Sequence, residues 1–373
     1  GMLIGPGLHI VTPDMFGSAG QIFTTLALVV VLFKSGVNFN VSALRGTALQ
    51  GVLLATCMFL LAGAGIAFCS YWLLDLPLLA ACVIGAIAAS NYSAVVIPLL
   101  GKINVADNTR TVLFLEANLT GVYAIVVSLA LIGVLVTGAK VSAGYMLFEV
   151  VKSFAIGIGF ALAAGLFWMS VLNHVRRMEN AVSLTFAFVL LVYGATKLLG
   201  GDGAIATLVF GIVAGNIRVF SRLWLHKFEI KGFALNAEER VFFDEVEFIF
   251  KTLFFVYMGI CMRVGAWGPV AAGLLVVLVK FLLRLPVADF CTAKTMSRGD
   301  TAVLWAMCPN GLVSAVLAAM AAQQLPGEGE TVQDVVYAVI FFGVILSNLL
   351  SFRLQKGGLQ GFVNSAFSRH ISQ

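Results

Sequence analysis

Long apolar stretches separated by short polar segments dominate the pattern of this chain. A membrane-spanning helix needs about 20 consecutive, mainly apolar residues, and eleven stretches approach or exceed that length. They lie near residues 20–36, 46–71, 76–100, 109–136, 145–172, 181–199, 203–218, 241–262, 267–292, 301–323 and 333–352. The pattern therefore predicts an all-α polytopic membrane protein with about eleven visible transmembrane helices, forming a single transmembrane domain over residues 1–373.

Two of the apolar stretches carry polar residues at their centres, where hydrocarbon makes them costly unless they face protein or water. The stretch at 76–100 contains Ser90 and Asn91, and the stretch at 301–323 contains Asn310 between a proline and a glycine. Proline and glycine interrupt a helix and free backbone groups. The two stretches run in opposite directions, which indicates an inverted repeat, and such interrupted helices point to the binding site of a transporter.

We expect Asn91 and Asn310 to meet where the interrupted helices cross, to cap the freed helix ends and to line a cavity. The alternative is that both form interhelical hydrogen bonds that only hold the helix bundle together. The proline–glycine break and the inverted pairing favour the cavity.

Composition agrees with a membrane protein, because 60% of the residues are hydrophobic and only 11% are charged, against about 25% charged residues in a soluble domain. The six cysteines form no Cys-x-x-Cys pair and the four histidines show no ligand spacing, so neither a metal nor another cofactor is expected. The chain has no Ser/His/Asp set and no nucleotide-binding loop, so we expect neither an enzyme nor a nucleic-acid-binding protein.

Positive charge in the loops predicts the orientation in the membrane. Fifteen lysines and arginines fall on one side, and only Lys140, Lys197 and Arg263 fall on the other. Cytoplasmic loops carry the excess of positive charge, so we expect a plasma (inner) membrane protein with a cytoplasmic C-terminus. Residues 1–8 resemble the end of a further span, which indicates a truncated N-terminus. The polar loop at 218–240 is either an amphipathic surface segment or a solvated linker.

Several ionisable residues fall inside the predicted spans, where charges are rare and paired or functional. Glu116 and Arg284 have opposite signs at similar depth, which predicts a buried structural ion pair. Lys34 lies at the inner end of its span, where it either extends to the interface or provides a fixed positive charge at the mouth of an ion path.

The sequence allows two interpretations for two further lysines. Lys251 and Lys280 either extend to the membrane interface or pair with Asp244 and Glu247, which lie near the start of the span that contains Lys251.

Several short motifs together resemble the monovalent cation/proton antiporter superfamily, in its NhaP-like sodium/proton antiporter branch. They lie at residues 3–8, 32–37, 253–259, 284–286 and 309–318. The resemblance implies a 13-helix fold with a dimerisation domain and a core domain that carries two crossed, interrupted helices. It also implies alternating access, a homodimer in the lipid bilayer, and a monovalent cation and a proton as the transported partners.

The chain departs from the pattern of that superfamily at the ion site. Its members carry Thr-Asp-Pro where residues 90–92 read Ser-Asn-Tyr, and Glu-Ser-x-x-Asn-Asp where residues 116–121 read Glu-Ala-Asn-Leu-Thr-Gly. Asn310 stands in place of an arginine, and Lys34 in place of an acidic residue. The chain retains one part of the pattern, the Glu116 and Arg284 pair, which the resemblance implies is structural.

Three functional hypotheses follow from this comparison. The first is a sodium or potassium/proton antiporter with alternating access at the crossing, and the second is a transport-inactive relative that acts as a sensor or complex subunit. The second is motivated by the loss of titratable groups from the site. The third is a transporter with an anionic or neutral substrate, because a neutral site flanked by Lys34 and two half-helix N-termini favours such a substrate. The candidate ion- or substrate-binding residues are Ser90, Asn91, Thr120, Asn310 and Lys34.

Overall fold

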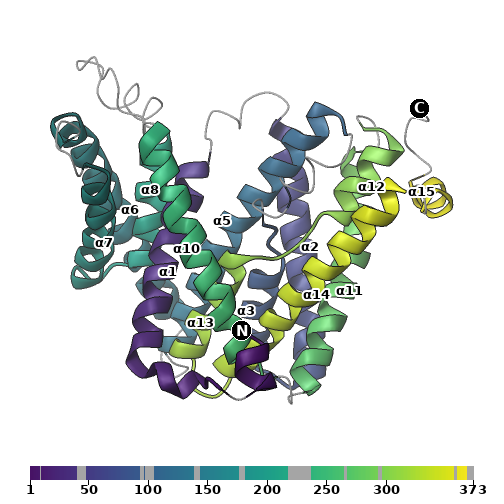
Figure 1. Cartoon of the computed structure of the whole chain (residues 1–373), viewed down its shortest axis with the longest axis horizontal. Helices are drawn as coiled ribbons and strands as arrows, with labels where there is room; N and C mark the ends of the chain where they lie inside the picture. The colour runs from purple at the N-terminus through teal and green to yellow at the C-terminus, as the bar shows by residue number, and fades with distance from the viewer. Residues whose placement is uncertain are drawn as a thin grey trace. The chain divides into compact units, whose positions relative to one another are not determined.

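The computed structural model describes residues 1–8, 10–39, 48–92, 96, 105–137, 143–175, 181–216, 237–263, 267–292, 296–356 and 359–367. All regular elements within these ranges are helices (Figure 1). The chain divides into two compact units, which we describe separately.

The first unit contains Gly1, Pro13–Ala43 and Thr137–Tyr257. Its helices are α1 (Gly17–Asn38), α6 (Ala143–Val175), α7 (Ala181–Leu198), α8 (Gly203–Gly215) and most of α10 (Ala237–Cys261), preceded by the short turn η2 (Pro13–Phe16). Helix α8 packs against α1, α6 and α7 and thereby forms the centre of this unit.

Glycines allow α1 and α8 to approach backbone to backbone, as small residues do in membrane helix pairs. A Cβ atom added to Gly36 of α1 would lie 2.3 Å from the carbonyl oxygen of Leu208. A Cβ atom added to Gly211 of α8 would lie 2.3 Å from the carbonyl oxygen of Phe33. Only glycine therefore fits at these two positions of the interface.

The second unit contains Met2–Thr12, Leu44–Val136 and Met258–Gln373. Its elements are η1 (Leu3–Gly7), α2 (Ala48–Leu74), α3 (Leu78–Ala88), α5 (Asp107–Thr137), α11 (Trp267–Thr292), α12 (Arg298–Ala306), α13 (Leu312–Gln324), α14 (Gly329–Gln355) and α15 (Gln360–Ala366). Helix α11 packs against α2, α12 and α14, and α3 packs against α2, α13 and α14.

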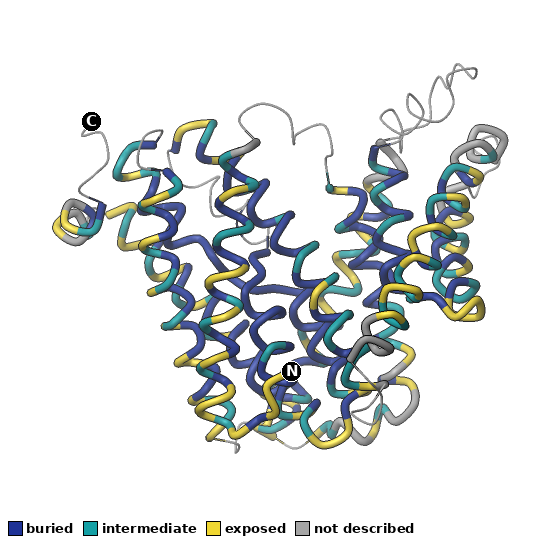
Figure 2. The backbone as a smooth tube through the Cα atoms, turned by 180° about the vertical axis from the view of Figure 1, so that it is seen from behind, coloured by how far each residue is buried: buried dark blue, intermediate teal, exposed yellow. Residues whose placement is uncertain are grey.

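Both stretches with central polar residues stop being helical at those residues. Helix α3 ends at Ala88, and most of the later half of that stretch lies outside the described residues. Helix α12 ends at Ala306, residues 307–311 are not helical, and α13 begins at Leu312. Most residues of α3, α12 and α13 are buried, whereas α2 and α11 expose residues along much of their length (Figure 2).

A helix lies at each of the eleven apolar stretches, so the prediction of an all-α protein is confirmed. In the described part of the chain, five helices are long and apolar enough to cross a membrane, namely α2, α5, α6, α11 and α14. Five further apolar helices are shorter, so the count of eleven spans and the inverted repeat remain predictions. The tail contains the unpredicted helix α15. Of the loop at 218–240, residues 218–236 lie outside the described ranges.

Replacing Gly36 by alanine tests the close contact between α1 and α8. We expect Gly36→Ala to lower the stability of the protein by about 1–3 kcal/mol, because the added methyl group overpacks a rigid backbone contact. The measurement is thermal unfolding of the purified protein in detergent. Gly159→Ala on α6 is the matched control, because its Cβ would meet no atom within 4 Å. An unchanged Tm for Gly36→Ala would contradict this packing.

Candidate functional site

The two interrupted segments of the second unit meet directly through their backbones. The backbone N–H of Tyr92, just beyond α3, donates to the carbonyl oxygen of Pro309, between α12 and α13, at 2.9 Å. A Cβ atom on Gly311 would lie 2.1 Å from the ring carbon Cδ1 of Tyr92. The crossing therefore requires a glycine at this point.

Asn310 caps the C-terminal end of α3. The last carbonyl groups of a helix lack donors within the helix, and the Asn310 Nδ2 atom donates to the carbonyl oxygens of Ala88 at 3.0 Å and Ser90 at 2.8 Å. The hydroxyl groups of Ser90 and Ser314 lie 2.9 Å apart and add a second link between α3 and α13. These contacts join the end of one interrupted helix to the start of the other.

Arg284 of α11 and Glu116 of α5 form a fully buried ion pair. Both carboxylate oxygens of Glu116 accept from the guanidinium group, and the Nη2–Oε2 distance is 2.7 Å. Arg284 also donates from Nε and Nη2 to the carbonyl oxygen of Leu304, at 3.0 and 2.9 Å, and thereby caps the end of α12. Both residues are 0% exposed, so the two charges depend on each other.

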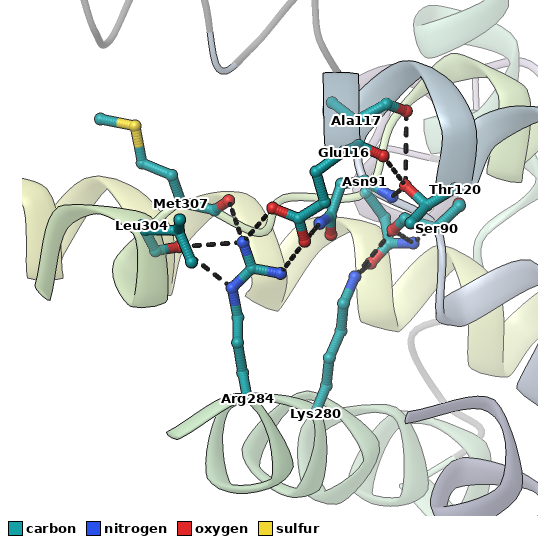
Figure 3. Close-up of polar contacts among 10 residues, drawn as sticks. Ser90, Asn91, Glu116, Ala117, Thr120, Lys280, Arg284, Leu304 and Met307 are labelled. Carbon is teal, nitrogen blue, oxygen red and sulfur yellow. Dashed lines mark hydrogen bonds and ion pairs between the residues drawn. The ribbon is translucent and has the colours of Figure 1, made fainter. Parts of the chain in front are cut away.

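Lys280 lies one helical turn before Arg284 on the same face of α11, and Figure 3 shows both side chains directed to the crossing. Its ammonium group donates to the carbonyl oxygen of Ser90 at 2.8 Å and to Oδ1 of Asn310 at 2.7 Å. The residue is only 1% exposed. Both acceptors are neutral, so Lys280 has no carboxylate partner in these two bonds.

The prediction that Lys280 extends to the membrane interface or pairs with Asp244 or Glu247 is therefore wrong. The physical reason is that the carbonyl oxygens freed at the crossing need donors, and α11 supplies two of them from one face. The spacing of four residues between Lys280 and Arg284 places both on that face, so the sequence groups the two side chains but does not show what they contact.

Asn91 connects the crossing to α5. Its backbone N–H donates to Oγ1 of Thr120 at 3.1 Å, and its Nδ2 atom donates to Oε1 of Glu116 at 2.9 Å. The carboxylate accepts only, so this bond fixes which end of the Asn91 amide carries nitrogen. The amide oxygen Oδ1 is buried and has no hydrogen-bond partner among the described residues.

The charges at the crossing do not cancel. In the part of the chain that the structure describes, the crossing contains one carboxylate, Glu116, and two basic groups, Lys280 and Arg284. Glu116 is already bound by Arg284 and by Asn91 (Figure 3). The crossing therefore carries a surplus positive charge whenever Lys280 is protonated, and its remaining acceptors are neutral oxygen atoms.

Four of the five candidate binding residues gather at the crossing, namely Ser90, Asn91, Thr120 and Asn310. Sequence reasoning missed Lys280 and Ser314 there.

Lys34 belongs to the other compact unit, where its ammonium group pairs with Asp244. Its side chain is 8% exposed and that of Asp244 is 63% exposed. Lys251 pairs with Glu247 on the same helix, at 3.4 Å.

Comparison with known proteins gives a consistent set of relatives. A family model described as "Sodium/hydrogen exchanger, transmembrane" matches residues 1–356. The K(+)/H(+) antiporter NhaP2 of Shewanella sp. (strain MR-4) is 27% identical over 201 residues, which cover 53% of this chain and 35% of that protein. The low-affinity Na(+)/H(+) antiporter NhaS1 of Synechocystis sp. is 24% identical over 379 residues, which cover 95% of this chain and 68% of that protein.

A solved structure has the same fold. The sodium proton antiporter MjNhaP1 from Methanocaldococcus jannaschii at pH 8 superposes with a TM-score of 0.73, covering 97% of this chain and 89% of that chain at 20% identity. The match with the NhaP2 relative spans about a third of that protein's length, 35%.

Removing the charge of Glu116 tests the buried pair. We expect Glu116→Gln to destabilise the protein by about 3–5 kcal/mol, because it leaves the Arg284 guanidinium buried without a countercharge. Chemical unfolding in detergent measures the difference. Glu330→Gln is the control, since Glu330 pairs with Arg263 at the surface with its side chain 68% exposed and such pairs contribute about 0–1 kcal/mol. Equal losses in the two variants would contradict a special role for the buried pair.

Proposed function

The chain belongs to the sodium/hydrogen exchanger family, and on this basis we propose that it is a secondary transporter that exchanges sodium or potassium ions for protons across the membrane. The curated relatives described above carry names of K(+)/H(+) and Na(+)/H(+) antiporters, which supports this choice of substrates. The fold shared with MjNhaP1 supports the same transport architecture.

The single observation that carries the proposal is the oxygen-lined crossing of the interrupted helices. The Asn91 amide oxygen is buried and lacks a partner in the described residues, and hydroxyl or carbonyl oxygens of Ser90, Thr120 and Asn310 lie in the same hydrogen-bonded network. Such oxygens replace the hydration shell of a monovalent cation. The C-terminal end of α3 also presents a partial negative charge there, as half-helix ends do in transporters that bind cations.

The wider architecture follows as part of the same proposal. The apolar stretches would form eleven spans of a 13-helix fold with inverted repeats, and the crossing would open alternately to each side of the membrane. The charge distribution in the loops supports a cytoplasmic C-terminus in the plasma membrane. A homodimer in the bilayer is the assembly that the resemblance implies.

One observation favours a second candidate function. The crossing carries two basic groups against one carboxylate among the described residues, and such a site attracts an anion more strongly than a cation. The chain would then transport an anion or a neutral solute, or would have lost transport and would serve as a sensor or complex subunit.

Flux measurements in proteoliposomes test the proposal. We expect pulses of sodium or potassium chloride to drive proton movement by the wild-type protein, read with a pH-sensitive dye. Asn91→Leu should lower this flux by about tenfold or more, which corresponds to about 1.4 kcal/mol of lost cation binding. Asn348→Leu on the exposed part of α14 is the matched control and should leave the flux unchanged, since its amide donates to the carbonyl oxygen of Val344 in its own helix.

Other results of the flux measurements would support the alternative functions. Uptake of labelled chloride without any proton response to cations would support the anion transporter. No flux in the wild type, with a gain in Asn91→Asp combined with Gly121→Asp, would support an inactivated antiporter. Gly121 has room for this change, because its Cβ would meet no atom within 4 Å.

A further inference from the structure

We propose that Lys280 is the group that exchanges protons at the crossing, because its ammonium group holds the oxygen atoms that a monovalent cation would bind. The cation then binds as Lys280 loses its proton. This inference rests on the proposed cation/proton exchange, and the experiments below separate the failure of one from the failure of the other.

The Lys280 ammonium group and a bound cation would compete for the same oxygen atoms. The ammonium nitrogen of Lys280 lies 2.8 Å from the carbonyl oxygen of Ser90 and 2.7 Å from Oδ1 of Asn310. A sodium or potassium ion at the crossing would need these acceptors together with the unpartnered oxygen of Asn91. Two positive charges at such a short separation repel strongly in a poorly solvated interior. The ion and the ammonium group are therefore mutually exclusive.

The two basic groups of α11 differ in whether a carboxylate holds them. Arg284 has both carboxylate oxygens of Glu116 as partners, and a guanidinium group does not lose its proton in proteins. The hydrogen bonds of Lys280 end on neutral oxygens, and a buried ammonium without a countercharge is costly. Lysine is the basic side chain that sheds its proton under such conditions.

The ionisable groups near Lys280 are less suited to change their charge. Within the described residues, the groups that face Lys280 are Glu116 of α5, Arg284 of α11 and Cys308 between α12 and α13. Protonating Glu116 would remove the countercharge of the buried Arg284 guanidinium and weaken the bond from Asn91. The Cys308 thiol is neutral and is 1% exposed, so ionising it would place a further charge in the interior. Lys280 changes its charge at the smallest structural cost.

The exchange balances in protons and charge. The protonated amine of Lys280 releases its proton to water on the side that is open, the amine becomes neutral, and one cation occupies the vacated oxygens. On the other side the cation leaves and the amine takes up one proton. The crossing carries a single positive charge in both states, so one cation exchanges for one proton and a membrane potential does not drive the cycle.

Calorimetry on the full chain in detergent tests the binding step without transport. The probes are sodium chloride and potassium chloride, with choline chloride as the ionic-strength control, titrated in two buffers of different ionisation enthalpy over a pH series. We expect the wild type to release close to one proton per cation bound. Lys280→Met should bind the cation without releasing a proton. Lys152→Met, which removes a half-exposed ammonium paired with Glu149 on α6, should behave as the wild type. Cation binding by the wild type without proton release would overturn the inference.

Proteoliposomes test the coupled cycle. Lys280→Met and Lys280→Arg should each lower cation-driven proton movement by about tenfold or more, the first because no proton is carried and the second because the charge is permanent. The wild-type rate should not change when an ionophore imposes a membrane potential. A potential-dependent wild-type rate, or full coupling in Lys280→Met, would overturn the role of Lys280.

The two proposals fail in different ways. Proton release on cation binding without any flux would support Lys280 and overturn the proposed transport. Flux that survives in Lys280→Met would support transport and overturn Lys280. Elution volume and thermal unfolding of each variant verify that it folds, and the proton release of the wild type requires no variant at all.

Discussion

The constraint on which this structure depends is that backbone carbonyl groups freed inside a membrane helix bundle must find donors within the protein. A membrane interior supplies no water to satisfy them. Helices α3 and α12 both end within buried segments, and three side chains donate to carbonyl oxygens at these ends, besides the hydroxyl groups of Ser90 and Ser314. Asn310 and Lys280 serve the end of α3, and Arg284 serves the end of α12. Two of these three donors come from one face of α11, so this helix holds both interrupted segments in place.

The same arrangement places two positive charges next to two helix C-termini, where the helix dipole favours them. The two basic groups nevertheless differ in whether they can lose a proton. Arg284 is held by a carboxylate on α5 and remains charged, so it serves the architecture. Lys280 is held by neutral oxygens only, so the crossing has one fixed and one adjustable basic group. A transporter needs this division, because its scaffold must stay intact while the charge at its binding site changes.

How much the sequence predicts depends on how local the signal is. The helices follow from apolar stretches of sufficient length, and the Glu116 and Arg284 pair follows from opposite charges at similar depth, since either charge alone would be too costly. The interruption near Asn310 follows from its proline and glycine neighbours. Lys280 was missed because a lysine near the middle of an apolar helix can reach an interface through its long stem, and only the tertiary position of the freed carbonyls decides otherwise. The pairing of Lys34 with Asp244 likewise joins helices far apart in sequence, and no local pattern encodes it.

The departures of the chain from its relatives' pattern take on a physical meaning at this crossing. An asparagine at position 310 offers both a donor and an acceptor, so it caps α3 with Nδ2 and holds the Lys280 ammonium with Oδ1, which an arginine in that place has no acceptor to do. An asparagine at position 91 donates to Glu116 and leaves the Arg284 pair intact, whereas an ionised aspartate there would repel that carboxylate. The loss of two acidic groups and one basic group from the pattern therefore leaves a crossing in which, among the described residues, Glu116 and Arg284 pair with each other and Lys280 bonds only to neutral oxygens. Cation/proton exchange requires a group that changes charge, and the geometry of the described residues leaves this role to the amine of Lys280.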